Sequence, residues 1–447
     1  MSLTAQLAGI IRNTRYESLS AADVAIVKRL IADGVAVAVA GAKEHAPQLF
    51  AEQVREQGGS EQCPVWGFGF RTSPVSAAYA NAASMHVLDF EPMSSPSTHA
   101  ISPTVPVAFA LAVRDGLNGR ELLTACAKGF EIQGRLLASV DHRRESSKFH
   151  APGVVGPFGS AVVAGHLLGL DEQQLNYALA IAASRSGALR ANIGHGVKCT
   201  HCGNAAAAGL EAAMLAKRGL TANDDILGHV DGFVAAFFPK GIDRDLLLAY
   251  GKPFRFSDPG MAIKFYPSKY PTHFAIGAAL EVRKLIADSA LINAVNLITP
   301  SMPDVDRPEP VSGLEGKFSF QYTAAAALLD GKVGIASFHD QRRFRGDMKS
   351  MLRRMKVTVD SSLPTAFNRM QISIEVKLHD GTVHRATCTR PPGFWGAPLD
   401  IEQHRAKVAD CLAMRLDKVK AARVTELLES LETLDAQGVR ELSLLLE

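Results

Sequence analysis

Apolar residues recur at helical spacing through roughly the first 265 residues of the chain. Val24, Val27, Ile31 and Val35 mark one side of such a stripe, which is typical of an amphipathic helix. This stripe predicts a helix over residues 22–41. The same pattern predicts further helices over residues 107–113, 160–168, 173–184 and 204–218. The last of these carries a run of alanines ending at Gly209, which would let neighbouring helices approach closely.

The period of the pattern changes after about residue 270. Apolar residues alternate with polar ones over 355–359 and 372–378, as in strands with one buried face. Asp380-Gly381 then predicts a hairpin turn into a less regular return strand, 383–388. A short strand over 294–298 and helices over 275–287, 319–329 and 401–446 complete this half of the chain.

These patterns predict a mainly α protein with two domains, since 447 residues are too many for one compact core. We expect residues 1–268 to form a large helical domain that the C-terminal helices, 396–447, complete. Residues 269–395 would form a smaller α+β domain whose sheet contains the antiparallel hairpin.

Composition and charge narrow the classes of protein. A formal net charge of +3, without a block of Lys and Arg, argues against a nucleic-acid partner. The first residues lack the features of a secretory signal, and no apolar run reaches the length of a membrane helix. Six cysteines in so long a chain do not resemble a disulfide framework. We therefore expect a cytoplasmic protein with no membrane contact.

Motifs for common cofactors are missing. Trp66-Gly67-Phe68-Gly69 is not a dinucleotide fingerprint, and the chain has no P-loop, HExxH or GxSxG sequence. Cys199-Thr200-His201-Cys202 could offer metal ligands, but a structural zinc site needs four and no second paired cluster exists. Buried thiols at a helix start are the simpler interpretation, so we expect no cofactor and no metal.

Polar residues cluster where the helical pattern breaks. If the helix continues, His86 and Asp89 lie one helical turn apart, before the loop that carries His99. His150 precedes a Pro-Gly turn, and His195 and Lys198 precede a helix N-terminus, a favourable place for an anion.

Lys264, Lys269 and His273 flank Tyr266-Pro267 at the presumed domain junction. Each residue alone has a structural alternative: a satisfied buried histidine, a solvated lysine, or a core tyrosine in the case of Tyr322. If the loops converge, His and Lys could act as general acids and bases, and Lys and Arg could bind carboxylates.

At these residues the sequence resembles the MmgE/PrpD family, from about residue 20 to residue 415. The motifs that carry the resemblance are Val65-Trp66-Gly67, His86-Val-Leu-Asp89-Phe, Phe149-His150, Leu189-Arg-Ala-Asn192, Lys198 with His201, Gly203-Asn-Ala-Ala206, Tyr266-Pro267 with Thr272-His273, and Ser319-Phe-Gln-Tyr322. The family includes 2-methylcitrate dehydratase, cis-aconitate decarboxylase and iminodisuccinate epimerase.

The resemblance implies a homodimeric, cofactor-independent enzyme that acts on a small di- or tricarboxylate in a cleft between its domains. Residue by residue, it assigns the site to Asp89, His99, His150, Lys198, Lys264 and Tyr322. The sequence departs from the decarboxylase pattern at two places. After Asp-Phe the pattern has a second carboxylate and a Thr, whereas here Glu91 is followed by Pro92 and Met93. After the Phe-Pro pair the pattern has a His, whereas this chain has Lys269. A Lys changes both the proton relay and the charge that faces a substrate.

From this departure we expect an epimerase of iminodisuccinate type, which abstracts a proton next to a carboxylate. Lys198 with His99 or Lys269 would transfer protons, His150, Lys264 and Arg190 would bind carboxylates, Asp89 would orient a histidine, and Tyr322 would donate a hydrogen bond to the intermediate. His86, His201 and His273 would line the substrate site. The alternatives are a decarboxylase or dehydratase on a tricarboxylate, and a non-catalytic protein that binds carboxylates.

Overall fold

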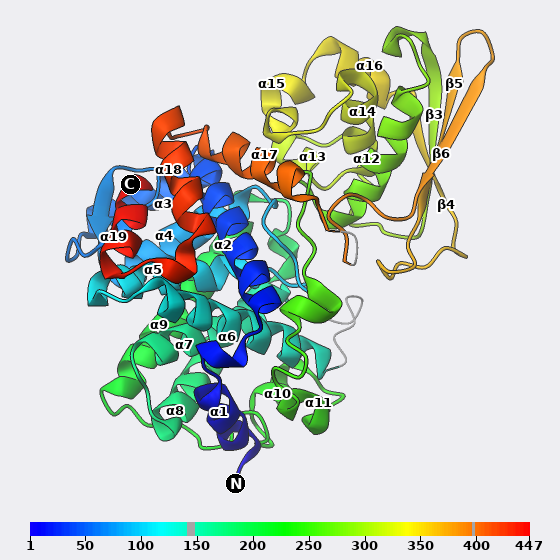
Figure 1. Ribbon diagram of the computed structural model, residues 1–447. Coiled ribbons are helices and arrows are strands. Elements are labelled where there is room, and N and C mark those ends of the chain that lie inside the picture. The colour runs from blue at the N-terminus through cyan, green and yellow to red at the C-terminus, as the bar shows by residue number, and fades with distance from the viewer. Residues whose placement is uncertain (141–147, 396–397) are drawn as a thin grey trace. The chain divides into compact units, whose positions relative to one another are not determined.

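The computed structural model describes residues 1–140, 148–395 and 398–447. It divides into two compact units (Figure 1). Unit 1 comprises residues 1–87, 91–263 and 400–447, and unit 2 comprises residues 88–90 and 264–399. The segment expected to complete the helical domain starts at residue 396, and residues 396–397 lie outside the described residues.

Unit 1 is built from helices, together with one two-stranded antiparallel sheet. Its helices are α1 (Leu3–Asn13), α2 (Ala21–Gly41), α3 (His45–Gln57), α4 (Pro74–Val87), α5 (Ile101–Asp115), α6 (Gly119–Ala138), α7 (Ala151–Leu167), α8 (Glu172–Ala183), α9 (Thr200–Lys217), α10 (Phe233–Phe237), α11 (Arg244–Leu248), α17 (Ile401–Leu412), α18 (Lys418–Glu429) and α19 (Ala436–Leu445). The strands are β1 (Cys63–Val65) and β2 (Phe70–Thr72). The C-terminal helices pack on this unit, with α17 and α18 against α2 and α19 against α5 (Figure 1).

Helix α9 is central to unit 1 because it contacts α4, α5, α7 and α8. The small residues predicted to permit close packing do so. A methyl group added at Gly209 would stand 2.4 Å from the carbonyl oxygen of Pro157 and 2.4 Å from Cβ of Ser160, both on α7. At Gly41 an added methyl group would lie 1.9 Å from the backbone oxygen of Ser84, where α2 meets α4. Helix contacts this close exclude any side chain at either position.

Helix α5 begins earlier than its sequence suggests. The sequence pattern predicts a helix from Val107, but α5 begins at Ile101 and contains Pro103 and Pro106. Pro103 is in the first turn, where the missing N–H costs no hydrogen bond. Pro106 does remove one hydrogen bond from the interior, yet every residue from Ile101 to Ala112 is buried. Packing on all sides therefore outweighs the local preference of proline.

Unit 2 contains a four-stranded sheet covered by helices. Its elements are α12 (Tyr270–Arg283), β3 (Ile292–Thr299), α13 (Gly313–Gly316), α14 (Phe320–Asp330), α15 (Asp340–Arg343), α16 (Gly346–Leu352), β4 (Met355–Val359), β5 (Ile372–Leu378) and β6 (Val383–Cys388). The strand order is β4-β3-β5-β6. Strands β3 and β4 are parallel, whereas β3–β5 and β5–β6 are antiparallel.

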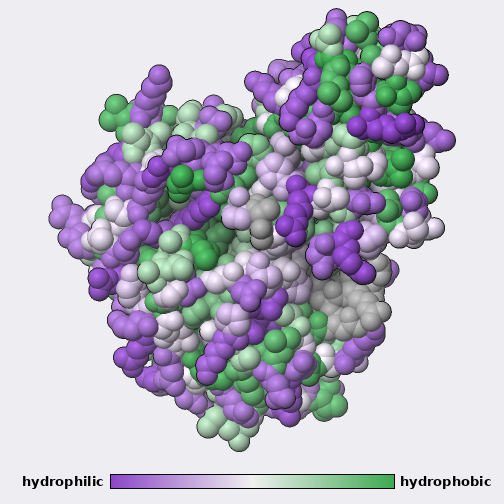
Figure 2. All heavy atoms as spheres, turned by 45° about the vertical axis from the view of Figure 1, so that its right-hand side comes forward, coloured by the Kyte–Doolittle hydropathy of each residue, from purple (hydrophilic) through white to green (hydrophobic). Residues whose placement is uncertain are grey.

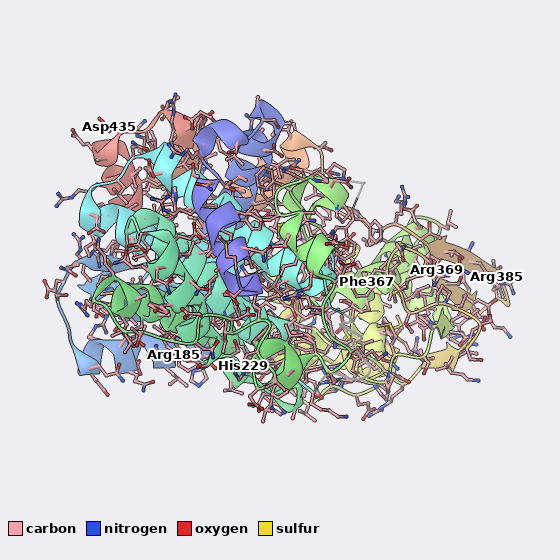
Figure 3. The ribbon with its side chains drawn as sticks, turned by 90° about the horizontal axis from the view of Figure 1, so that it is seen from below. Arg185, His229, Phe367, Arg369, Arg385 and Asp435 are labelled. Atoms are coloured by element: carbon pink, nitrogen blue, oxygen red, sulfur yellow. The ribbon has the colours of Figure 1, made fainter. Side chains whose placement is uncertain are left out.

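The hairpin predicted from Asp380-Gly381 is confirmed, since Lys377 pairs with Val383 across it. The buried side chains of β5, Ile372, Ile374 and Val376, alternate with polar ones, and α12 contacts both β5 and β6 (Figure 1). The alternate positions carry a cross-strand ion pair, with Arg385 Nε 2.5 Å from Glu375 Oε1. Figure 3 labels Arg385 at the outer edge of this unit. One covered and one solvated face explain the two-residue period seen in the sequence.

Among the described residues, no helix combines the length and apolar character needed to cross a bilayer. The face drawn in Figure 2 mixes hydrophilic and hydrophobic side chains over both units. Most of the candidate site residues are instead buried.

The close contact at Gly209 generates a stability prediction. Replacing Gly209 with Ala should lower the free energy of unfolding by about 1–3 kcal/mol, because the methyl group overpacks the α7–α9 contact. Helix propensity alone would predict a gain of roughly 0.5–1 kcal/mol. The control is Gly346→Ala at the start of α16, where an added methyl group meets nothing within 4 Å. Urea denaturation checks both variants, and a Gly209→Ala protein as stable as the parent would contradict the packing argument.

Candidate active site

Helix ends in unit 1 gather four histidines, here called the histidine cluster: His86, His99, His150 and His201. His86 lies in the last turn of α4, His99 just before α5, His150 at the N-cap of α7 and His201 in the first turn of α9. The ring centroids are 4.5 Å apart for His86 and His99, 5.6 Å for His86 and His150, and 5.2 Å for His150 and His201. Because these four helices contact one another, their ends meet although the histidines span 115 positions of sequence.

Glu91 supplies the carboxylate of this cluster. It is fully buried, and its Oε1 lies 2.5 Å from His86 Nδ1, 2.9 Å from His99 Nδ1 and 3.0 Å from the Ser102 hydroxyl, which donates to it. Burial raises the pKa of Glu91, but the neighbouring imidazoles of His99 and His86 outweigh burial and hold that pKa well below its usual range. A carboxylate only accepts hydrogen bonds, so His86 carries its proton on Nδ1 and keeps Nε2 as an acceptor.

The imidazoles of His86, His150 and His201 are held neutral. Burial, reinforced by the charge of Lys198, lowers the pKa of His86 to about 3 and that of His201 to about 4. The same two causes hold the pKa of His150 well below its usual range. His150 Nδ1 lies 3.0 Å from His201 Nδ1, a contact in which one ring donates and the other accepts. At neutral pH these three rings are therefore uncharged, and each can donate one hydrogen bond and accept another.

Lys198 is the cation beside the histidine cluster. It lies in the short 3₁₀ helix η3 (Gly196–Cys199) that leads into α9, and it is 7% exposed. Its charge depresses the pKa values of His86, His150 and His201, so its ammonium group is electrostatically coupled to all three. A cation in this position can stabilise negative charge that develops on a carboxylate substrate.

Asp89 and Lys264 form a buried ion pair in unit 2. The ammonium group of Lys264 donates to the carboxylate of Asp89 and, at 2.9 Å, to its backbone oxygen. Lys317 donates to the backbone oxygen of Leu88 at 3.1 Å. The two lysines are 1% and 2% exposed. Two buried ammonium groups thus hold consecutive carbonyl groups of the segment that follows α4.

The expected helical relation between His86 and Asp89 is wrong. Helix α4 ends at Val87, and Asp89 has a φ of 52°, in the left-handed region that non-glycine residues rarely adopt. The acid that contacts His86 is Glu91, two residues further on. An orienting role for Asp89 toward a histidine stays a prediction.

The remaining candidates in unit 2 have partners of their own. Lys269 at the N-cap of α12 forms an ion pair with Asp304. The hydroxyl group of fully buried Tyr322 donates to the backbone oxygen of Ser337, so donation to an intermediate would require that bond to break. His273 Nε2 lies 3.3 Å from the oxygen of Ser268, and the ring packs between Tyr266 and Tyr270. A role for His273 in lining the substrate site stays a prediction.

Arg190 lies in the 3₁₀ helix η2 (Arg190–Asn192) of unit 1. Its backbone N–H donates a hydrogen bond to the backbone oxygen of Lys148 at 2.9 Å. The arginine is half-buried, and its predicted contact with a carboxylate stays a prediction.

Cys199 and Cys202 are buried free cysteines, and burial raises the pKa of the Cys199 thiol to about 12. A protonated thiol is a poor metal ligand, which is consistent with the simpler interpretation of this motif.

Three polar residues were not predicted from the sequence. Glu91 was not among the candidate site residues, although its position five residues after His86 could have indicated a contact. Lys317 directly precedes the Phe318-Ser319 motif and could have been included for that reason. Asp304 lies 35 residues from Lys269 in a loop, and no local pattern points to their pairing.

Comparison with known proteins identifies two family models that match this chain and several full-length relatives. A family model described as the MmgE/PrpD N-terminal domain matches residues 5–244, and one described as the MmgE/PrpD C-terminal domain matches residues 266–433. Cis-aconitate decarboxylase of Mus musculus is 32% identical over 97% of this chain and 91% of its own length. The Homo sapiens protein of the same name is 32% identical over 97% and 92%. A cis-aconitate decarboxylase of Aspergillus terreus is 24% identical over 91% and 88%.

The contact between Glu91 and His86 predicts one tautomer. Nitrogen-15 NMR of histidine-labelled protein at pH 7 should show a neutral His86 ring protonated on Nδ1, because the carboxylate accepts that proton. Glu91→Gln keeps an acceptor oxygen and should preserve the tautomer, whereas Glu91→Leu removes the acceptor and should shift the ring toward protonation on Nε2. An Nε2–H ring in the parent protein would overturn the assignment.

Proposed function

The chain belongs to the MmgE/PrpD family, and we propose that it is a cofactor-independent lyase that decarboxylates cis-aconitate or a closely related tricarboxylate. The observation that carries this proposal is the 32% identity, over nearly the whole chain, to two proteins named cis-aconitate decarboxylase. These comparisons favour the lyase over the epimerase that the Lys269 departure suggested.

The reaction requires a proton donor and a site that tolerates several negative charges. When cis-aconitate loses carbon dioxide, the electron pair of the broken carbon–carbon bond forms a new double bond. The far carbon of the old double bond then takes up a proton, which gives itaconate. We assign the proton transfer to Lys198 and His99, and carboxylate binding to His150, Arg190 and Lys264. The position of Lys198 supports this assignment, because its ammonium group is electrostatically coupled to His86 and His150 and can stabilise negative charge on a carboxylate substrate.

An epimerase is the second candidate, and the ion pair between Lys269 and Asp304 favours it. At the position where the decarboxylase pattern has a His, this chain carries a lysine that a carboxylate holds in place. Lys269 could serve as the second proton-transfer group that inversion of a carbon centre requires. An epimerase keeps the mass of its substrate, whereas a lyase releases carbon dioxide or water, so the product separates the two reactions.

The first test is turnover by the purified protein in deuterated water, followed by proton NMR. We expect cis-aconitate to give itaconate that carries deuterium at the carbon protonated by the enzyme. Iminodisuccinate, offered separately, should stay unlabelled. Deuterium at its α-carbon with interconversion of stereoisomers would replace the lyase by the epimerase. Tight binding of either compound without turnover would favour a carboxylate-binding protein instead.

The proposed role of Lys198 predicts a large loss of rate. Lys198→Met should lower kcat by about 10²–10⁴-fold, the usual contribution of one acid–base group, while the fold is retained. Lys284→Met is the matched control, because Lys284 is exposed and, within the described part of the chain, forms an ion pair with Glu281 in the adjoining turn. Steady-state kinetics with circular dichroism checks both variants. Near-normal kcat in the folded Lys198→Met protein would remove Lys198 from the mechanism.

The homodimer and the small polycarboxylate partner expected from the family remain part of this proposal. The roles of Asp89 and Tyr322 likewise remain proposals, to be tested once the substrate is known.

A further inference from the structure

We propose that His86, His99 and His150 of unit 1 form a binding site for a divalent d-block ion such as Zn²⁺, and that an ion bound there stops turnover. The binding part stands on the geometry of unit 1 alone. The inhibition part rests on the proposed function, because the same imidazoles and the adjacent Lys198 are assigned there to substrate binding and proton transfer.

The geometry of three ring nitrogens carries the binding part. Each of the three histidines offers one nitrogen, and these nitrogens all lie within 4.8 Å of one another. A tetrahedral zinc ion with bonds of about 2.0–2.1 Å needs nitrogens roughly 3.4 Å apart. Small rotations of the rings would close the difference. Three histidines with a fourth position left open are one of the arrangements that bind zinc in proteins.

A second, independent observation comes from the surroundings of His86. Its Nε2 is buried and has no hydrogen-bond partner among the residues that the structure describes. Its Nδ1 is engaged by Glu91, whose carboxylate also lies 2.9 Å from His99 Nδ1. Metal-binding histidines usually direct their second nitrogen toward a carboxylate, which orients the ring and makes it a stronger ligand. Glu91 holds both rings in this manner.

A neighbouring charge acts against such an ion. Lys198 places a positive charge beside the cluster and must weaken the binding of a cation. Removing that charge should therefore tighten metal binding, even though it is predicted to abolish turnover.

The ligand set selects the kind of ion. Three neutral imidazoles suit Zn²⁺, Co²⁺, Ni²⁺ and Cu²⁺, whereas Mg²⁺ and Ca²⁺ prefer oxygen ligands. Glu91 uses its oxygen to hold the rings and contributes charge without being counted among the three ligands. We therefore expect binding of zinc-like ions and no effect of magnesium at equal concentration.

The test titrates Co²⁺ into chelator-treated protein without substrate and follows the visible absorption of the bound ion. We expect one ion per chain, displaced by Zn²⁺ and unaffected by Mg²⁺. His86→Ala and His150→Ala should weaken binding by more than tenfold, and Glu91→Gln by roughly 10–100-fold, the usual effect of an outer-shell partner. His229→Ala is the control, because that histidine (labelled in Figure 3) is exposed and is not one of the three ligands.

Lys198→Met separates this proposal from the proposed function. Its Co²⁺ affinity should rise severalfold while its turnover is lost. The metal site would be overturned if the parent protein bound no Co²⁺, or if His86→Ala bound Co²⁺ as tightly as the parent. Neither result depends on which substrate the protein turns over. This outcome remains decisive if His150→Ala fails to fold, because Lys198→Met and Glu91→Gln keep all three ligands.

The inhibition part is tested with the parent enzyme and its active substrate. Zn²⁺ should lower turnover and a chelator should restore it, with the substrate competing against Co²⁺ for the site. Bound Co²⁺ with full turnover would overturn the inhibition part alone. Absence of turnover with every substrate would instead count against the proposed function and leave the binding result intact.

Discussion

The arrangement of unit 1 around its histidines depends on one buried carboxylate. Glu91 contacts His86, His99 and Ser102, which come from the end of α4, the segment before α5 and the first turn of α5. An ionised carboxylate without water is costly unless hydrogen bonds satisfy it, so these contacts must form together. The ring orientations and the tautomer of His86 follow from that requirement.

The same constraint explains why the imidazoles stay neutral. One carboxylate cannot balance several protonated rings in a buried space, and the nearby charge of Lys198 further disfavours their protonation. A cation next to neutral rings suits the binding of an anionic substrate. Neutral rings are also the protonation state in which histidine binds a metal. The proposed catalysis and the proposed metal binding thus draw on a single electrostatic arrangement.

In unit 2, buried lysines hold a segment of backbone in place. Lys264 and Lys317 each donate to a carbonyl group in the Leu88–Asp89 segment, and the Asp89 carboxylate balances Lys264. These bonds help to hold Asp89 at its positive φ, in a region that few non-glycine residues adopt. A residue held in a rare conformation by buried charges is a frequent feature of functional segments, and it supports the assignment of Asp89 as a site residue.

The sequence by itself determined the mainly helical character, the sheet hairpin and the family, because helical period, strand alternation and turn chemistry are local properties. It also predicted His86, His99, His150, His201 and Lys198 as candidate site residues, through the resemblance to the family. Only the tertiary structure decided that α5 begins at Ile101, because burial on every side outweighs two prolines. Only it showed that Glu91 contacts His86 and that Asp304 pairs with Lys269. Such contacts depend on where chain segments meet, and neither period nor spacing records that.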